Sequence, residues 1–176
     1  MRILGIDPGS HHTGWGAIDS FGSKMELVDT GVIDGGPGDL VKRLCTIADR
    51  LEEVLRDVRA DAVAVETIFH AKNSQSAFQL GQARGVILLC AARTGAEIFE
   101  YSAGQIKQAV TGGGRADKEQ VQTMVRLMLH LKGALRFDAT DALACAICHG
   151  SMHGSRAARF LRSHKSERGT RLKVEG

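Results

Sequence analysis

The spacing of apolar residues changes several times along the chain, and each change predicts a different element. Three short apolar runs come first: Arg2 to Asp7, Thr13 to Ile18 and Met25 to Ile33. Turn-forming residues separate them, namely Pro8-Gly9-Ser10 and Phe21-Gly22-Ser23-Lys24. Apolar runs joined by such tight turns are typical of β-strands, so this part of the chain is expected to form an antiparallel meander.

From Asp39 onward the pattern changes to helical spacing. Asp39 is the expected N-cap of a helix that carries apolar residues up to Val58. A mostly apolar run from Ala60 to Val65 predicts a strand buried on both faces, with Glu66 at its C-terminal end. The later elements are a helix at Ser74 to Arg93, a strand at Glu97 to Tyr101, and helices at Gln105 to Val110, Lys118 to Leu131 and Asp138 to Met152. Such an order predicts an α/β layer fold with a mixed sheet.

Composition and charge suggest one globular domain followed by a basic tail. The chain has 176 residues, of which 43% are hydrophobic and 24% charged. No apolar stretch is long enough for a membrane span or a secretory signal, so we expect a cytoplasmic protein. The net charge is +3, but residues 153–176 hold seven basic and two acidic side chains, which leaves residues 1–152 slightly acidic. We interpret 153–176 as a solvated, flexible tail, with weak phosphate contacts as the alternative.

Four acidic residues stand at positions where they can meet. Asp7 and Glu66 each end an apolar strand, and ligands of open α/β sheets bind beyond the carboxyl ends of the strands. Asp138 and Asp141 lie three positions apart at the start of a helix, and therefore on one face. Taken singly, Asp138 could be a helix cap and Asp141 a solvated acid.

Together, these carboxylates suit a hard divalent cation. Mg²⁺ prefers oxygen ligands and keeps several waters, so a few convergent carboxylates and a substrate phosphate suffice to hold it. Two such ions about 4 Å apart can activate a water and stabilise the leaving oxygen of a phosphoryl transfer. The sequence thus favours phosphodiester hydrolysis by activated water, without a covalent enzyme intermediate.

The cysteines suggest buried thiols rather than disulfides or a metal site. All four lie within apolar helical patterns: Cys45, Cys90, Cys145 and Cys148. The segment Cys145-Ala146-Ile147-Cys148-His149 has the form of a haem-attachment motif, but it continues the helix that begins at Asp138. We interpret it as part of a core helix.

Three segments resemble the RuvC family of Holliday-junction resolvases over roughly residues 1 to 152. They are Gly5-Ile6-Asp7-Pro8-Gly9-Ser10 with Thr13-Gly14-Trp15-Gly16, then Glu66-Thr67-Ile68-Phe69 continuing through Lys72-Asn73 and Ser76-Ala77 to Leu80-Gly81-Gln82-Ala83-Arg84-Gly85, and Asp138-Ala139-Thr140-Asp141-Ala142-Leu143-Ala144. The middle segment is the most specific of the three, and the order and intervals also agree.

The resemblance implies a fold, an activity and partners. It implies an RNase H-like fold with a mixed five-stranded sheet flanked by helices, in which Asp7, Glu66, Asp138 and Asp141 are the catalytic, metal-binding acids. RuvC-like enzymes are homodimers that bind four-way DNA junctions. They nick two opposing strands symmetrically with Mg²⁺ or Mn²⁺, and we expect two ions per site. Partnership with the branch-migration proteins RuvA and RuvB is implied as well.

Candidate DNA contacts follow partly from this resemblance. Lys107 and Lys118 match basic positions that the family places near DNA, and other candidates for phosphate contacts are Lys72, Arg84 and Arg115. Phe69 could stack on an unpaired base at the crossover, although without the resemblance a core position would be the better interpretation.

The dimer contact is expected on the helix Ser74 to Arg93. Small residues recur along it, namely Ala77, Gly81, Ala83 and Gly85, and would let two helices approach closely. Packing on its own sheet is an equally good interpretation, because the helix also carries Phe78, Val86, Leu88 and Leu89.

Three rival functions remain open at this point. An ATP-binding protein of the actin and sugar-kinase type would need a second phosphate loop and a longer chain. A junction- or RNA-binding protein of the same fold without catalysis is disfavoured because all four acids are present. An RNase H-type enzyme acting on RNA–DNA hybrids is disfavoured by the segment from Glu66 to Gly85.

Overall fold

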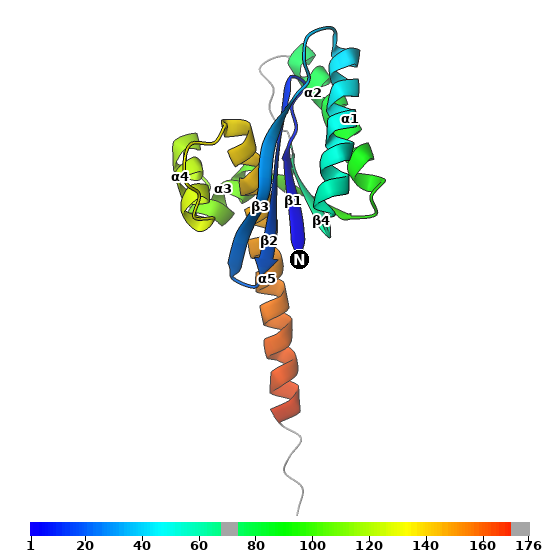
Figure 1. Cartoon of the computed structure of the whole chain (residues 1–176). Coiled ribbons are helices and arrows are strands. Elements are labelled where there is room, and N and C mark those ends of the chain that lie inside the picture. Colours follow the sequence, from blue (N-terminus) through cyan, green and yellow to red (C-terminus); the bar gives the residue numbers. More distant parts are fainter. Residues whose placement is uncertain (68–73, 170–176) are drawn as a thin grey trace, which may run out of the picture.

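A computed structural model describes residues 1–67 and 74–169, with residues 154–169 as backbone alone. The strands are β1 (Arg2–Asp7), β2 (His12–Phe21), β3 (Lys24–Asp34), β4 (Ala62–Thr67) and β5 (Glu97–Ser102). The helices are α1 (Leu40–Val58), α2 (Ser74–Ala92), α3 (Ala103–Thr111), α4 (Lys118–Met128) and α5 (Phe137–Gly169). Figure 1 shows their arrangement around the sheet.

The described strands form one mixed sheet in the order β3-β2-β1-β4-β5. β1, β2 and β3 are antiparallel neighbours, as the tight turns between them predict. β4 then pairs parallel with both β1 and β5. The RNase H-like fold expected from the resemblance, with its mixed five-stranded sheet, is therefore confirmed.

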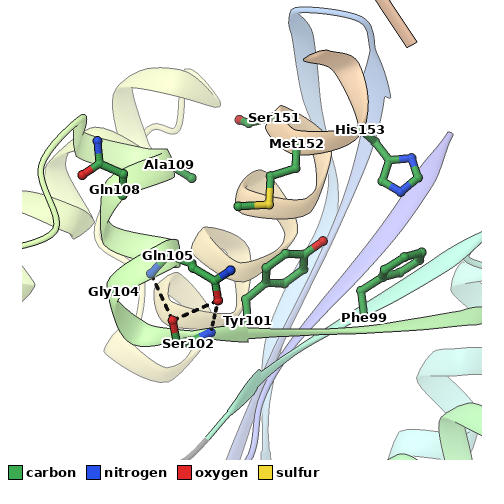
Figure 2. Close-up of a pocket in the computed structure, with 10 residues that line it drawn as sticks. All are labelled: Phe99, Tyr101, Ser102, Gly104, Gln105, Gln108, Ala109, Ser151, Met152 and His153. Carbon is green, nitrogen blue, oxygen red and sulfur yellow. Dashed lines mark hydrogen bonds between the residues drawn. The ribbon is translucent and has the colours of Figure 1, made fainter. Parts of the chain in front are cut away.

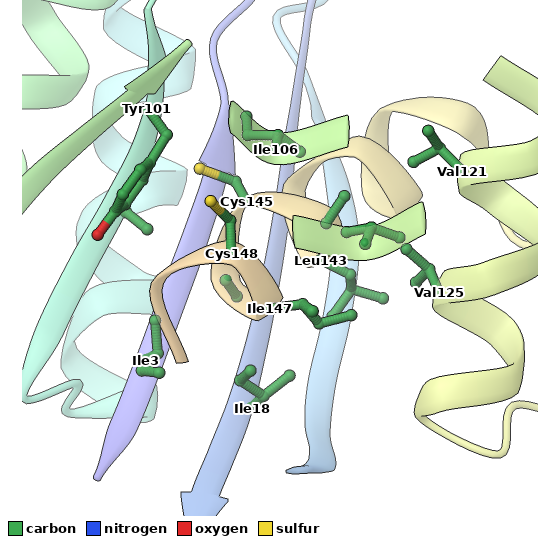
Figure 3. Close-up of a cluster of buried hydrophobic side chains, with 14 of the residues drawn as sticks. Ile3, Ile18, Tyr101, Ile106, Val121, Val125, Leu143, Cys145, Ile147 and Cys148 are labelled. Atoms are coloured by element: carbon green, nitrogen blue, oxygen red, sulfur yellow. The ribbon is translucent and has the colours of Figure 1, made fainter. Parts of the chain in front are cut away.

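Helices cover the sheet on both faces and make two separate hydrophobic cores. Along β1, Leu4 and Ile6 face α1 and α2, whereas Ile3 points to the opposite face and packs with residues of α3, α4 and α5. Figure 3 shows this second core, in which Leu143 and Ile147 of α5 lie over the strands. Since side chains alternate along a strand, the odd-numbered residues of β1 face α5.

Two glycines let α5 lie directly on the sheet. A Cβ on Gly5 of β1 would come within 1.9 Å of the carbonyl oxygen of Ala142, and one on Gly14 of β2 within 1.9 Å of the carbonyl oxygen of Asp138. Both obstacles are backbone atoms, which cannot move aside as a flexible side chain could. Glycine is thus required at both positions for the N-terminal half of α5 to reach the sheet.

Several predicted boundaries are wrong, with local physical reasons. The helix predicted to reach Leu131 ends at Met128, because His130 adopts the left-handed region (φ 52). The helix predicted to end at Met152 continues to Gly169, and Figure 1 shows its end extending beyond the sheet. No proline interrupts residues 153–169, so nothing in the sequence forces an end there. Whether 153–176 act as a separate flexible unit stays a prediction.

One cysteine differs from its predicted environment. Cys90, Cys145 and Cys148 are buried free thiols, as predicted, but Cys45 is exposed. The buried stripe of α1 includes Ile47, Leu51, Leu55 and Val58, and Cys45 falls on the opposite side of the helix. None of the helices in the described residues combines the length and apolar character needed to cross a membrane.

Candidate active site

Strand register places Asp7 and Glu66 side by side. Ile6 of β1 pairs with Val65 of β4 in parallel register, so the two acids that follow them occupy neighbouring strand ends. Ala64 lies in the core beneath α5, and alternation gives Glu66 the same face. Asp7 shares this face as an odd-numbered residue of β1. Both carboxylates therefore point to the side of the sheet that α5 covers.

Helix α5 brings the other two acids over the same strand ends. Asp138 is the second residue of α5 and lies inside its first turn. It is therefore not the N-cap of this helix, which was the alternative interpretation of Asp138 taken singly. Asp141 follows three residues later on the same face. The contact between Gly14 and the backbone of Asp138 fixes the height of this helix end above β2.

The four carboxylates are close enough to perturb one another. Burial, followed by the charges of Asp141, Glu66 and Asp138, raises the pKa of Asp7 to about 8. Burial and the charge of Asp141 raise the pKa of Glu66, and burial also raises the pKa of Asp141. Each shift disfavours the ionised form, with burial as the largest cause and the charge of at least one neighbouring acid adding to it.

Two lysines oppose this repulsion. Lys118, the first residue of α4, places its Nζ 2.8 Å from Oδ2 of Asp141. The charges of Lys107 and Lys118 both lower the pKa of Glu66 and of Asp141, against the larger effect of burial. Both lysines thus lie beside Glu66 and Asp141, and their contact with DNA stays a prediction.

Two of the acids, Glu66 and Asp141, line a small cavity of about 190 Å³ together with both lysines, and we call it the acid cavity. Its walls are formed by Glu66, Ala103, Ile106, Lys107, Lys118, Val121, Asp141 and Ala144. The donor set consists of carboxylate oxygens, which fits Mg²⁺ or Mn²⁺ rather than a softer metal. Among the described residues, no three acidic, histidine or cysteine side chains are gathered closely enough to hold an ion in this side-chain arrangement.

The remaining DNA-contact candidates are placed unevenly. Arg84 of α2 is ion-paired with Glu100 of β5, so a described acid already neutralises its charge. Arg115 is exposed in the loop between α3 and α4. Phe69 and Lys72 lie outside the described residues.

Two neighbours of the acids were missed by sequence reasoning. Phe137 places its ring centroid 5.1 Å from Nζ of Lys118, and Arg136 places Nη2 3.4 Å from Oδ2 of Asp138. Both immediately precede Asp138 in sequence, which was the available signal. Nothing in the local pattern, however, shows that Phe137 would meet a lysine nineteen positions earlier.

A larger cavity of about 850 Å³ lies elsewhere, between β5, α3 and α5, and contains none of the four acids. Figure 2 shows its lining, with Phe99, Tyr101, Met152 and His153 around the opening. Ser102 caps α3 here through a reciprocal bond with Gln105. Its lining contains no carboxylate, so it offers no acidic ligand for a hard divalent cation.

The fold and the acid pocket together define an RNase H-like protein with a carboxylate site of the kind that metal-dependent nucleases use. The family model described as "Crossover junction endodeoxyribonuclease RuvC" matches residues 3–149. A relative of that name from Citrifermentans bemidjiense is 48% identical over 158 residues, covering 89% of this chain and 96% of the relative.

Solved structures agree with the family match. RuvC of T. thermophilus in complex with a Holliday-junction substrate superposes with a TM-score of 0.82 at 37% identity, over 88% of this chain and 96% of the other. The yeast mitochondrial Holliday-junction resolvase Ydc2 shares the fold at a TM-score of 0.62 and 10% identity, over 92% of this chain and 83% of the other. The chain belongs to the RuvC family.

Proposed function

We propose that this protein resolves four-way DNA junctions by hydrolysing one phosphodiester in each of two opposing strands. The observation that carries the proposal is a cluster of four acids: Asp7 and Glu66 at the ends of two adjacent strands, and Asp138 and Asp141 at the start of α5. Burial and the charges of the other three acids raise the pKa of Asp7. Family membership supplies the substrate class, since a 37% identical relative has been solved with a Holliday junction.

Asp7, Glu66, Asp138 and Asp141 would hold two Mg²⁺ ions, with Mn²⁺ as a substitute. Asp7 and Glu66 would contribute to both ion positions, because they stand side by side on β1 and β4. Divalent cations there supply charge stabilisation and an activated water for in-line displacement at phosphorus. Burial and then the charges of the neighbouring acids raise the pKa of Asp7 to about 8, and a bound cation would relieve the part of this shift that comes from the neighbouring charges.

Lys107 and Lys118 would contact the phosphates beside the cut. Both border the acid cavity, and Lys118 has more than half of its side chain exposed. An ammonium at this position can hold a phosphate without reading the base sequence. Arg115 would extend this contact along the backbone, whereas the ion pair with Glu100 makes Arg84 a weaker candidate. Phe69 and Lys72 stay candidates on the sequence alone.

A homodimer would present two such sites to the two equivalent strands of a junction. Helix α2 is our candidate for the contact. Its inner face buries Ala83 and Ile87, whereas Phe78 and Leu89 are 68% and 53% exposed. Large exposed apolar side chains on one helix of a small domain are typical of an interaction surface.

The same family membership supports a proposal for the cellular setting. We propose that the protein works in the cytoplasm with RuvA and RuvB, which move the junction along DNA, in recombination and repair. The basic residues of 153–176 would add weak contacts to the phosphate backbone. The products would be nicked duplexes with ends that a ligase can seal.

The test is cleavage of three labelled substrates by the purified full chain: a synthetic four-way junction, a linear duplex and an RNA–DNA hybrid, each with Mg²⁺ and with EDTA. We expect paired, symmetric nicks in the junction with Mg²⁺ and no cleavage in EDTA. Preferred cleavage of the hybrid would instead show an RNase H-type enzyme, and junction binding without cleavage would show a non-catalytic relative.

A further inference from the structure

Phe137 is an exposed aromatic residue at the edge of the acid cavity with no role in the function proposed above. It opens α5, and 47% of its surface is exposed. Phe137 belongs to neither hydrophobic core, so a core role does not account for a large apolar side chain at this position. Its partner is the charged end of Lys118, which lies over the ring at 5.1 Å from the centroid.

Helical geometry places Phe137 and Asp141 where both contact Lys118. The two residues are four positions apart on α5, so their side chains are neighbours on one face. Nζ of Lys118 lies against both: 2.8 Å from Oδ2 of Asp141 and over the ring of Phe137. One helix thus holds the ammonium with two different groups, a carboxylate and an aromatic face.

A divalent cation bound at the site would affect the ion pair with Asp141 and the contact with the Phe137 ring differently. A carboxylate that binds a divalent cation shares its charge with that cation, which weakens its attraction for an ammonium. The ring of Phe137 is uncharged and does not compete for the cation. Attraction between an ammonium and an aromatic face can therefore persist after Asp141 has turned to another partner.

We propose that Phe137 is a positioning residue that keeps the ammonium of Lys118 at the acid cavity for contact with the scissile phosphate. This role rests on the proposed function. It predicts that the aromatic character of residue 137 matters for the cleavage step, while junction affinity depends on the many other phosphate contacts.

The kinetic test compares single-turnover cleavage and junction affinity for Phe137→Leu, Phe137→Tyr and Phe137→Trp. The Leu variant should cleave about two- to fivefold more slowly with little change in Kd, and the aromatic variants should restore the rate. Phe21→Leu is the matched control, because Phe21 is exposed at the opposite end of the sheet, beside the β2–β3 turn. A weaker Kd with an unchanged rate would show that Phe137 contacts DNA directly and would overturn the proposal.

A double-substitution test separates action through Lys118 from any other effect. In a Lys118→Gln background, Phe137→Leu should cause no further loss of rate, because the partner of the ring is gone. If the loss persists in that background, Phe137 acts independently of Lys118 and the proposal fails. If even the unmodified chain does not cleave the junction, the proposed function itself fails, and the positioning role of Phe137 in cleavage fails with it.

A spectroscopic readout tests the contact itself, whether or not the protein cleaves DNA. In the protein labelled with ¹³C-lysine, the methylene protons next to Nζ of Lys118 should resonate upfield because of the ring current of Phe137. Phe137→Leu should remove this shift, whereas Phe21→Leu should leave it unchanged. The shift should persist when Mg²⁺ is added, and its loss on addition of Mg²⁺ would contradict the proposed persistence of the contact.

Discussion

An acidic residue lies at each end of β1, and the pKa values of the two are shifted in opposite directions. At the C-terminal end, Asp7 lies among three other carboxylates, and its pKa is raised to about 8. At the N-terminal end, Arg2 donates through Nε and Nη2 to both carboxylate oxygens of Asp19, at 3.0 and 2.9 Å. The hydrogen bonds and charge of Arg2 lower the pKa of Asp19. The two acids lie on adjacent strands of one sheet.

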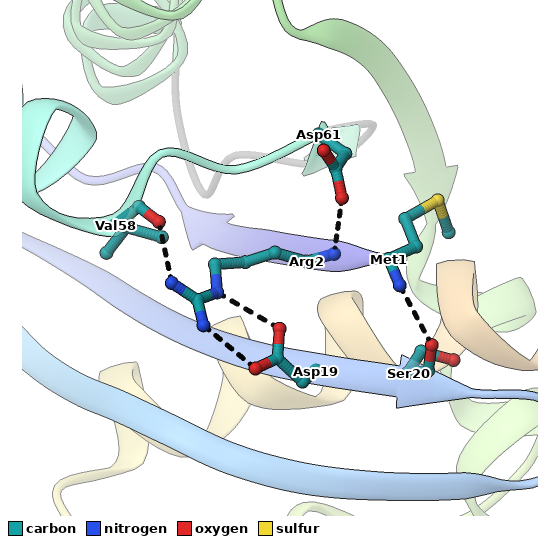
Figure 4. A network of polar contacts seen from close by, with 6 residues as sticks. All are labelled: Met1, Arg2, Asp19, Ser20, Val58 and Asp61. Atoms are coloured by element: carbon teal, nitrogen blue, oxygen red, sulfur yellow. Dashed lines mark hydrogen bonds and ion pairs between the residues drawn. The ribbon is translucent and has the colours of Figure 1, made fainter.

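Figure 4 shows the polar contacts that Met1 and Arg2 make at the N-terminal end of β1. The backbone N–H of Arg2 donates to Oδ2 of Asp61 at 2.7 Å, and its Nη1 donates to the carbonyl oxygen of Val58 at 3.3 Å. The terminal ammonium of Met1 donates to the carbonyl oxygen of Ser20. These bonds tie β1 to β2 and to the segment between α1 and β4, so this end has a structural role.

Asp7 and Asp19 are the same type of residue, so it is the environment of an acid, and not its residue type, that distinguishes a functional role from a structural one. A carboxylate with a matched cation stabilises the fold, whereas carboxylates that face one another cost stability until a cation binds. Perturbed pKa values of this kind concentrate at functional sites. Substitutions at Asp7 and Asp19 can therefore test the contrast directly.

The largest expected effect is on cleavage. Asp7→Asn should slow junction cleavage by about 10³-fold or more, because metal-ion catalysis contributes several kcal/mol and each 1.36 kcal/mol is a factor of ten. Junction affinity, measured by electrophoretic mobility shift in EDTA, should be retained. Asp19→Asn, the same change at the paired end, should cleave at the normal rate. Equal loss of binding and cleavage in the Asp7 variant would show a structural role for Asp7.

The next effect concerns stability in the absence of metal. The folded protein binds the Asp7 proton more tightly than the unfolded chain does, because its pKa rises from 3.8 to about 8 on folding. The contribution of this group to stability is therefore fully present below about pH 4 and is lost as pH rises toward 8. Replacing Asp7 with Asn removes this loss.

In EDTA at pH 8.5, Asp7→Asn should consequently be more stable than the unmodified chain, by on the order of 3 kcal/mol. The difference should shrink at pH 5. Urea unfolding at the two pH values measures it, and Mg²⁺ should stabilise the unmodified chain more than the variant. A variant that is less stable than the unmodified chain at pH 8.5 would contradict the repulsion inferred for this pocket.

Much of this site could be predicted from sequence because its acids mark the ends of regular elements. Asp7 and Glu66 follow apolar runs, and Asp39 is the N-cap of α1 that its position predicts. Parallel pairing of β1 with β4 then brings the first two acids together, as strand neighbours in an α/β fold would.

What sequence reasoning missed depends on contacts between distant parts of the chain. Phe137 meets Lys118 because α4 and α5 start at the same edge of the fold, and no local pattern encodes that meeting. Arg84 forms an ion pair with Glu100 of β5, a contact between distant residues that the sequence pattern does not predict and that makes Arg84 a weaker candidate for DNA contact. The exposure of Cys45 depends on the phase of α1 relative to the sheet, which the nearby apolar residues Leu44 and Ile47 leave ambiguous.

The smallest effect tests the paired end. Asp19→Asn should lower stability at pH 7 by about 1 kcal/mol, because one carboxylate of a bidentate, partly exposed pair loses its charge. The pKa of Asp19 is lowered by folding, so its contribution is present above about pH 4 and is lost as pH falls through its folded-state value. The stability curves of the unmodified chain and Asp19→Asn should converge in acid. At neutral pH the unmodified chain should be the more stable of the two, whereas the Asp7→Asn variant should be more stable than the unmodified chain. Glu26→Gln is the control, since the pair of Glu26 with Lys24 is more than half exposed on both sides and its loss should leave urea unfolding unchanged. If Asp19→Asn instead stabilised the protein at pH 7, the ionised carboxylate of Asp19 would be unfavourable in the folded protein, as that of Asp7 is. The contrast between the two ends of β1 would then be wrong.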